Sequence, residues 1–321
     1  MKSLASLSVD LDNKWSYMKI HGDSDWEEFP SYLDVVTPRI IDFASDIGLR
    51  MTVFVVGQDA ALSQNHDALS QLGESGLEIG NHSFHHEPWL HLKTDEEVSD
   101  EIIRADEAIS EATGMTPVGF RGPGFSVSQS TIRSLVRAGY VYDASTLPTF
   151  IGPLARAFYL RSTGMDSSER DRRDQLFGNA SDGLRPIEPY LWEMDDGGEL
   201  LEIPVTTMPV LKVPIHVTYL FYLARISPKI SKMYLSAALA MCRWKGVEPS
   251  LLLHSLDFLG HEDVAGLEFF PGMDLSGETK RELLADYISI LGRDRHIVSM
   301  AEHASALSLG SPKRVSLGSL A

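Results

Sequence analysis

Residues 4–12, Leu-Ala-Ser-Leu-Ser-Val-Asp-Leu-Asp, decide the fold. Apolar side chains alternate with small polar ones, a pattern that predicts an opening strand that ends at Asp12. Side chains two positions apart on a strand point to the same side, so Asp10 and Asp12 face one way. Two carboxylates held that close are costly unless a cation lies beside them. A surface strand with solvated carboxylates, or a turn at Asp12-Asn13, is the alternative interpretation.

A histidine cluster, Asn-His82-Ser-Phe-His85-His86, follows a short strand predicted over residues 76–80. His82 and His86 are four residues apart, and on a helical turn this spacing places both rings over one face. With one carboxylate they form an Asp-His-His set that leaves positions open for water and substrate, as a catalytic divalent metal requires. His85 is the main competitor for the ligand role, and a histidine-rich surface loop is the alternative.

A cation and a sharp turn follow another short strand, predicted over residues 118–121. Arg121 carries a permanent charge suited to holding a carboxylate ionised and oriented. The turn Gly122-Pro-Gly124 exposes backbone N–H groups, one of which could stabilise a developing oxyanion.

Two later motifs, Tyr-Asp143-Ala-Ser and Leu-Leu-His254-Ser-Leu-Asp257, add carboxylates and a late histidine. Each motif is weak by itself. Together they supply the groups that hydrolysis of an amide with a metal and water needs.

Strand and helix signals alternate along the chain. The clearest are strands over 51–56 and 251–254 and helices over 94–113, 130–138 and 278–291. Such alternation predicts a parallel sheet, most simply a barrel, and every candidate catalytic residue falls at or just after the carboxyl end of a strand. We therefore expect an α/β fold: a distorted (β/α) barrel of one domain, residues 1–305.

We expect a helical or irregular insertion at about 151–248 and a poorly ordered tail at 306–321. Residues 161–183 are highly charged and predict a solvated excursion. Residues 208–244 are apolar and aromatic. Their longest uncharged run, 213–224, is too short to span a bilayer, which takes about 18 residues. Core helices that cover the barrel are the simpler interpretation, and an interfacial or acyl-chain-binding surface is the alternative.

The composition limits which partners and which cellular compartment we expect. The formal net charge of −17 argues against nucleic acid or a bulk anionic membrane surface as partner. Cys242 is the only cysteine, so an intramolecular disulfide is excluded. Residues 1–6 lead into the first strand without a signal-peptide pattern, so we expect a cytoplasmic enzyme without a transmembrane segment, with peripheral membrane contact as an alternative.

Taken together, these motifs resemble the NodB-like polysaccharide deacetylases, a family of carbohydrate esterases, and especially the subgroup linked to exopolysaccharide loci. That subgroup has an Arg-x-Pro-x-Phe-Ser motif, a helix and a Tyr-Asp-Ser-Ser strand, an order that residues 120–126 and 140–145 follow. Residues 202–206, Glu-Ile-Pro-Val-Thr, also resemble a segment of the subgroup. The resemblance covers residues 4–150 and resumes at 199–206 and 249–304. It implies removal of acyl groups from N-acylated sugars with a metal and water.

The resemblance also implies roles for individual residues. They are a general base (Asp10), metal ligands (Asp12, His82 and His86), a tether for the base (Arg121), a general acid (His254) and an oxyanion contact (the N–H of Gly124). This chain departs from the family pattern in two places. Leu11 separates the two aspartates, and the aspartate that orients the acid histidine would fall near Pro148. Asp143 and Asp257 are the candidates to replace it.

We therefore expect a metal-dependent carbohydrate N-deacetylase with one divalent metal, zinc in the first place and cobalt, nickel, manganese or iron as alternatives. The expected substrate is an acylated amino sugar, with lipid-linked and nucleotide-linked precursors among the candidates, and a homo-oligomer is one further partner. Two other functions stay open. One is an amide or imide hydrolase of small nitrogenous compounds, and the other is a catalytically silent glycan-binding module.

Overall fold

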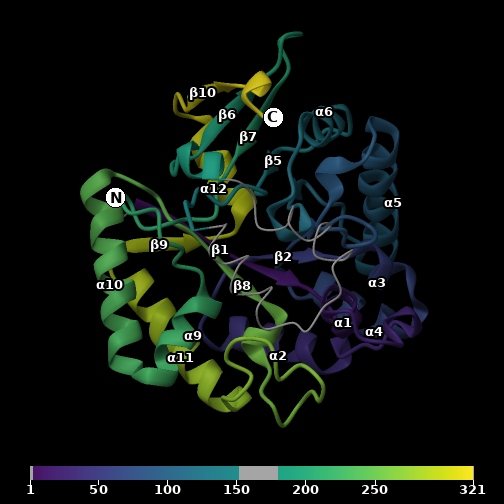
Figure 1. Ribbon diagram of the computed structural model, residues 1–321, viewed down its shortest axis with the longest axis vertical. Coiled ribbons are helices and arrows are strands. Elements are labelled where there is room, and N and C mark those ends of the chain that lie inside the picture. Colours follow the sequence, from purple (N-terminus) through teal and green to yellow (C-terminus); the bar gives the residue numbers. More distant parts are fainter. Residues whose placement is uncertain (1–2, 152–179, 321) are drawn as a thin grey trace.

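The computed structural model describes residues 3–151 and 180–320. Its centre is a ten-stranded sheet in the order β10-β6-β7-β5-β4-β3-β2-β1-β8, with β9 also paired to β1 (Figure 1). The strands are β1 Ser3–Leu11, β2 Thr52–Val55, β3 Glu78–Asn81, β4 Gly119–Phe120, β5 Tyr142–Asp143, β6 Tyr190–Glu193, β7 Glu199–Glu202, β8 Ser250–His254, β9 Arg295–Val298 and β10 Lys313–Ser316. Only the β6–β7 pair is antiparallel among these, so the predicted α/β fold with a parallel sheet is confirmed.

An irregular segment after β7 closes the sheet into a distorted barrel. Residues 203–206 continue along the end of β5, where Ile203 N–H donates to the Asp143 carbonyl at 2.9 Å. Thr206 N–H then donates to the Ser250 carbonyl at 2.9 Å, and Ser250 N–H donates back to Thr206 Oγ1 at 2.7 Å. Because β8 pairs with β1, these two bonds connect the segment after β7 to the strand at the far edge of the sheet.

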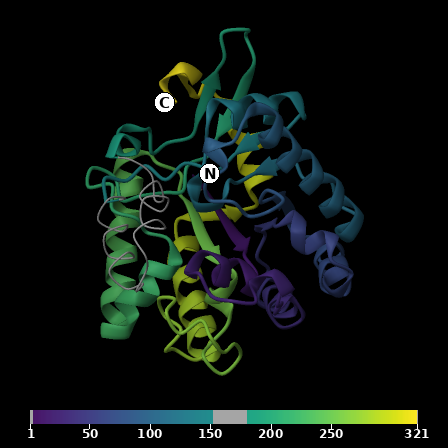
Figure 2. The same cartoon turned by 45° about the vertical axis from the view of Figure 1, so that its right-hand side comes forward.

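Helices cover the outside of this barrel. The α-helices are α1 Lys14–His21, α2 Leu33–Asp46, α3 Gly57–Ala61, α4 His66–Glu74, α5 Asp95–Thr113, α6 Gln129–Arg137, α9 Val217–Ile226, α10 Pro228–Lys245, α11 Gly277–Gly292 and α12 Met300–Ser308. The short 3₁₀ helices are η1 Trp26–Glu28, η2 Ser63–Asn65, η3 Leu90–Leu92, η4 Pro123–Phe125, η5 Ala180–Leu184, η6 Ser255–Phe258 and η7 Leu317–Ser319. Figures 1 and 2 show α9, α10 and α11 on one side of the barrel and α3 to α6 on the other.

The helix α5 begins and ends where the sequence predicts. Thr94 accepts the Glu97 N–H with its side chain, and Glu97 accepts the Thr94 N–H in return, which forms a capping box. Gly114 ends the helix with φ 71°, a left-handed conformation that glycine adopts without strain. The apolar side chains of its inner face are fully buried: Val98, Ile102, Ala105 and Ile109.

The apolar segment 208–244 contains α9 and α10, and the structure supports its interpretation as core helices. Leu220 and Phe221 of α9 and Leu235 and Leu239 of α10 belong to the main hydrophobic core. Among the described residues, no helix is long and apolar enough to cross a bilayer. Most of the charged stretch 161–183 lies outside the described residues.

The described residues beyond 305 include regular structure. Strand β10 pairs in parallel with β6, and η7 follows it. Leu317 and Leu320 are buried with Tyr190 and Trp192 in a second hydrophobic cluster. The domain boundary at residue 305 and the poor order of the tail stay predictions.

Thr206→Val should weaken the closure of the barrel. It removes the acceptor of the Ser250 N–H, and Ser250 is only 1% exposed, so the N–H would stay buried without a partner. We expect the free energy of unfolding to fall by about 1–3 kcal/mol in chemical denaturation. Thr206→Ser keeps the hydroxyl and should lose clearly less. Equal losses in both variants would assign the effect to packing of the methyl group instead.

Candidate metal centre

The candidate residues converge at the carboxyl ends of the barrel strands. Asp10 lies on β1 and Asp12 just beyond its end, and both are buried. The strand register places Asp10 opposite His254 of β8, and His82 comes directly after β3. The prediction that both aspartates of the first strand face one site therefore agrees with the structure, since each lies near His82.

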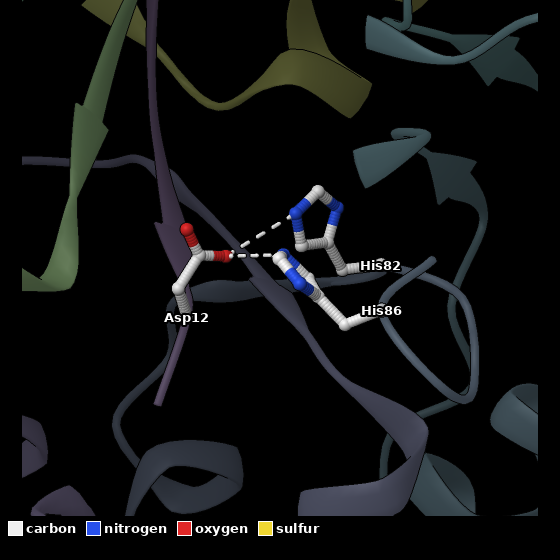
Figure 3. A group of neighbouring side chains, drawn as sticks. All are labelled: Asp12, His82 and His86. Atoms are coloured by element: carbon white, nitrogen blue, oxygen red, sulfur yellow. Dashed lines mark ion pairs between the residues drawn. The ribbon is translucent and has the colours of Figure 1, made fainter. Parts of the chain in front are cut away.

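Asp12, His82 and His86 form one compact group (Figure 3). Asp12 Oδ1 lies 3.4 Å from Nε2 of His82 and 3.0 Å from Nε2 of His86. All three side chains are buried, and their ligand atoms lie within 4.8 Å of one another. Among the residues that the structure describes, it is the one group of three or more His, Cys, Asp or Glu side chains close enough to share a metal ion.

The hydrogen-bonding state of this group fits a cation. His82 Nδ1 lies 2.6 Å from the Arg121 carbonyl, which can only accept, so Nδ1 carries the hydrogen. In its neutral form the ring presents the lone pair of Nε2 toward Asp12. Asp12 Oδ1 is itself buried and has no aligned hydrogen-bond donor. A lone pair that faces a buried carboxylate oxygen is unfavourable unless a cation binds both, so the residues fit one divalent metal.

Electrostatics keep the ligand carboxylate ionised. Burial alone would raise the pKa of Asp12, but the imidazoles of His86 and His82 lower it well below its ordinary value. Burial likewise opposes the charged form of His82, yet the nearby carboxylates of Asp10 and Asp12 raise its pKa. The site thus attracts positive charge strongly.

The two histidine rings converge through a loop and not through a helical turn, so that part of the prediction is wrong. Ser83 and His86 have positive φ angles of 60° and 51°. Glu101 of α5 holds the loop by accepting the backbone N–H groups of residues 84 and 85 at 3.1 and 2.9 Å. The spacing of four selected the right pair, but left-handed residues bring the rings together.

His85, the competing ligand, points elsewhere. Its Nδ1 lies 2.8 Å from Oε1 of Glu101, and its side chain is 41% exposed. Lys93 donates to the same carboxylate at 2.8 Å. Glu101 was not among the predicted site residues, although its position beside Ile102, on the buried face of a predicted helix, was a usable signal.

Arg121 contacts the proposed base as predicted. Its Nη1 donates to Asp10 Oδ1 at 2.7 Å and to Ser8 Oγ at 2.8 Å, and its Nε donates to the Ala144 carbonyl at 3.1 Å. The guanidinium is fully buried and lies over the Phe54 ring at 4.4 Å from the centroid. The second oxygen of Asp10, Oδ2, lies 3.9 Å from Nε2 of His82 and so is near the metal group.

The turn after Arg121 is held by Ser145, which lies just after β5. Gly122 N–H donates to Ser145 Oγ at 2.7 Å, and Ser145 donates to Asp143 Oδ1 at 2.5 Å. Gly124 has φ 60°, and a Cβ there would lie 3.1 Å from Pro88 Cβ, so its place in the turn favours glycine. The oxyanion role of its N–H stays a prediction.

Asp143 supports this turn and has no bond to His254. Burial and the neighbouring Glu202 raise the pKa of Asp143 well above its ordinary value, so the buried carboxyl group favours its neutral form. Glu202 in turn accepts from Thr146 Oγ1 at 2.6 Å and from Trp192 Nε1 at 3.1 Å.

Asp257 is the carboxylate linked to His254. It accepts the His254 backbone N–H at 2.8 Å, and Thr218 Oγ1 lies 3.0 Å from His254 Nδ1 and 3.2 Å from Asp257 Oδ1. Ser255 Oγ, next along the chain, donates to the Asp12 carbonyl at 2.5 Å. This bond therefore links the segment that carries His254, the candidate acid, to the segment that carries Asp12.

Comparison with known proteins agrees with this geometry. Residues 26–142 match the family model described as polysaccharide deacetylase. Over this segment the chain is similar to the polysaccharide deacetylase family. A candidate polysaccharide deacetylase from Mycobacterium smegmatis has the same fold, with a TM-score of 0.62 and 17% identity over 98% of this chain and 94% of that one.

Curated relatives of this chain carry related names. The peptidoglycan deacetylase-like protein FGM2 of Gibberella zeae is 35% identical over 219 residues, 64% of this chain and 62% of that protein. A peptidoglycan deacetylase of Helicobacter pylori is 24% identical over 162 residues, 49% of this chain and 53% of that protein. The chain thus spans somewhat more than half the length of these relatives.

His82→Ala should remove the metal from this site. After equilibration with zinc and then cobalt salts and removal of excess metal, elemental analysis should find close to one divalent ion per wild-type chain. The variant should retain far less, because a two-ligand site binds weakly. His85→Ala is the matched control and should retain the metal, since its ring contacts Glu101 instead. Undiminished metal in His82→Ala would refute the ligand assignment.

Proposed function

We propose that this chain is a metal-dependent N-deacetylase that removes the acetyl group from an amino sugar, and that it belongs to the exopolysaccharide-locus-like subgroup. One observation carries the proposal: the buried Asp12, His82 and His86 group lies beside an aspartate, Asp10, that a buried arginine contacts. Acetylated sugars are the substrates that the family implies. A metal group with an adjacent base fits hydrolysis of an amide.

Asp10 is the proposed base because its two oxygens have different surroundings. Arg121 contacts Oδ1, while Oδ2 is the oxygen near His82 Nε2. A divalent metal, when bound by the three ligands, supplies a Lewis acid that activates water and polarises the carbonyl group of the amide. Asp10 then accepts the proton of the attacking water at Oδ2, and the Gly124 N–H donates to the oxygen that becomes negative.

His254 is the proposed acid. Amide hydrolysis needs a proton on the leaving nitrogen, because an unprotonated amine anion is a very poor leaving group. The ring is only partly buried at the carboxyl end of β8, opposite Asp10 in the strand register. Its position therefore suits delivery of a proton from the side of the site opposite Arg121.

The proposed substrate is an N-acetylated amino sugar in a small or precursor glycan, and lipid-linked and nucleotide-linked forms are included. We propose that the enzyme acts on it in the cytoplasm. The names of the relatives support an acetylated amino sugar, and the net charge of −17 disfavours a strongly acidic polymer. Zinc is the proposed metal, since one carboxylate and two imidazoles suit it.

Asp10→Asn should slow turnover strongly without loss of the metal. Wild-type protein loaded with zinc or cobalt should release acetate from N-acetylglucosamine oligosaccharides. The variant should be slower by about 10²–10⁴-fold, the usual effect of removing a general base, and still contain its metal. Asp12→Asn is the contrasting variant and should lose the metal. Equal metal loss in both would show shared ligation. Cyclic imide hydrolysis without acetate release would favour the alternative hydrolase, and glycan binding without any hydrolysis would favour a silent binding module.

His254→Ala should separate substrates by their leaving groups. Hydrolysis of an N-acetyl amino sugar should fall severely, because the amine leaves only when protonated. Hydrolysis of an activated aryl acetate should fall much less, since its leaving group needs no proton. Metal content should be unchanged. An equal loss on both substrates would exclude the general-acid role.

A further inference from the structure

We propose that Thr218 is a positioning residue. Its hydroxyl links the buried carboxylate of Asp257 to the His254 ring by two hydrogen bonds, a relay that fixes which ring nitrogen carries the hydrogen. The catalytic consequence rests on the proposed function, because it requires His254 to act as the acid. The relay itself is a statement about hydrogen bonds and can be tested without activity.

Thr218 stands between the two groups. It is the second residue of α9 and is 4% exposed. Its Oγ1 lies 3.0 Å from His254 Nδ1 and 3.2 and 3.5 Å from the two oxygens of Asp257. The hydroxyl makes none of the capping bonds at the start of α9, where no side-chain cap is present. Its hydrogen bonds therefore involve His254 and Asp257.

The Thr218 hydroxyl has one hydrogen, so it can donate to only one of its two partners and must accept from the other. Asp257 also accepts the His254 backbone N–H. Burial raises the pKa of Asp257, while the His254 contacts and the charge of Lys280 oppose that rise. When Asp257 is ionised it can only accept, so the Thr218 hydrogen goes to Asp257. The Thr218 oxygen must then accept from Nδ1–H of His254.

This order leaves Nε2 as the nitrogen that exchanges protons. Among the described residues, none forms a hydrogen bond with Nε2 of His254. The neighbouring His216 ring, at 5.8 Å between centroids, does not compete as an acid: burial, and then the charge of His254, lower its pKa well below the ordinary value. A neutral His254 with its hydrogen on Nδ1 can take up a proton at Nε2 and pass it to the leaving nitrogen.

Thr218→Val tests the relay, because valine keeps the shape and removes the hydroxyl. We expect kcat for an N-acetyl amino sugar to fall by about 10- to 100-fold, the usual effect of losing a partner that orients a catalytic ring. KM and metal content should change little, and the activated aryl acetate should be less affected. Thr218→Ser keeps the hydroxyl and should restore most of the turnover.

A readout independent of activity is the ¹⁵N NMR spectrum of the His254 imidazole in full-length protein. The wild type and Thr218→Ser should show the Nδ1–H tautomer, and Thr218→Val should lose this preference. Asp257→Asn is a second variant for the case that Thr218→Val does not fold. Its amide NH₂ would donate to Thr218, turn the hydroxyl toward Nδ1 and so favour the Nε2–H tautomer.

The outcomes separate the two proposals. An unchanged His254 tautomer in Thr218→Val, or in Asp257→Asn if valine prevents folding, would overturn the relay. Equal kinetic losses for the serine and valine variants would overturn it as well. A wild type that shows the relay by NMR but releases no acetate would instead count against the proposed function alone.

Discussion

The buried ion pair between Arg121 and Asp10 is the interaction on which the rest of the site depends. A guanidinium with no exposed surface is tolerable only if nearly every donor finds an acceptor. Here Asp10, Ser8 and the Ala144 carbonyl accept from it, and the Phe54 ring covers one face. These contacts join β1 to β4 and to the end of β5. The Arg121 carbonyl also sets the tautomer of His82, so one residue fixes both the proposed base and a proposed metal ligand.

The sequence predicted the parts of the site that local periodicity controls. Alternation along β1 put Asp10 and Asp12 on one side, and the short strands before His82 and Arg121 put those residues at the same edge of the barrel. The path of the loop to His86 was not predictable in this way. Non-glycine residues rarely adopt positive φ, and Ser83 and His86 do so here because Glu101, from the next helix, holds the backbone of the loop.

Residues that act through distant partners escaped prediction for a related reason. Thr218 reaches His254 across 36 positions, and Tyr32 reaches Asp12, whose carbonyl accepts its hydroxyl at 2.6 Å, across 20. No spacing rule connects such pairs, because only the closed barrel brings them together. In the tail, Leu317 and Leu320 are likewise buried against residues distant in the sequence, Tyr190 and Trp192.

Backbone strain occurs beside the candidate site. Ser83, His86 and Phe125 have positive φ, and each such conformation costs about 1–3 kcal/mol and persists only where its surroundings enforce it. Here Glu101 braces the histidine loop, while Ser145 fixes the start of the turn that contains Phe125. Folding thus sets Nε2 of His82 beside the Asp12 carboxylate before any ligand arrives. Because the unfolded chain lacks that arrangement, a divalent cation held by these residues would bind the folded form preferentially, and its binding free energy would add to the stability of the fold.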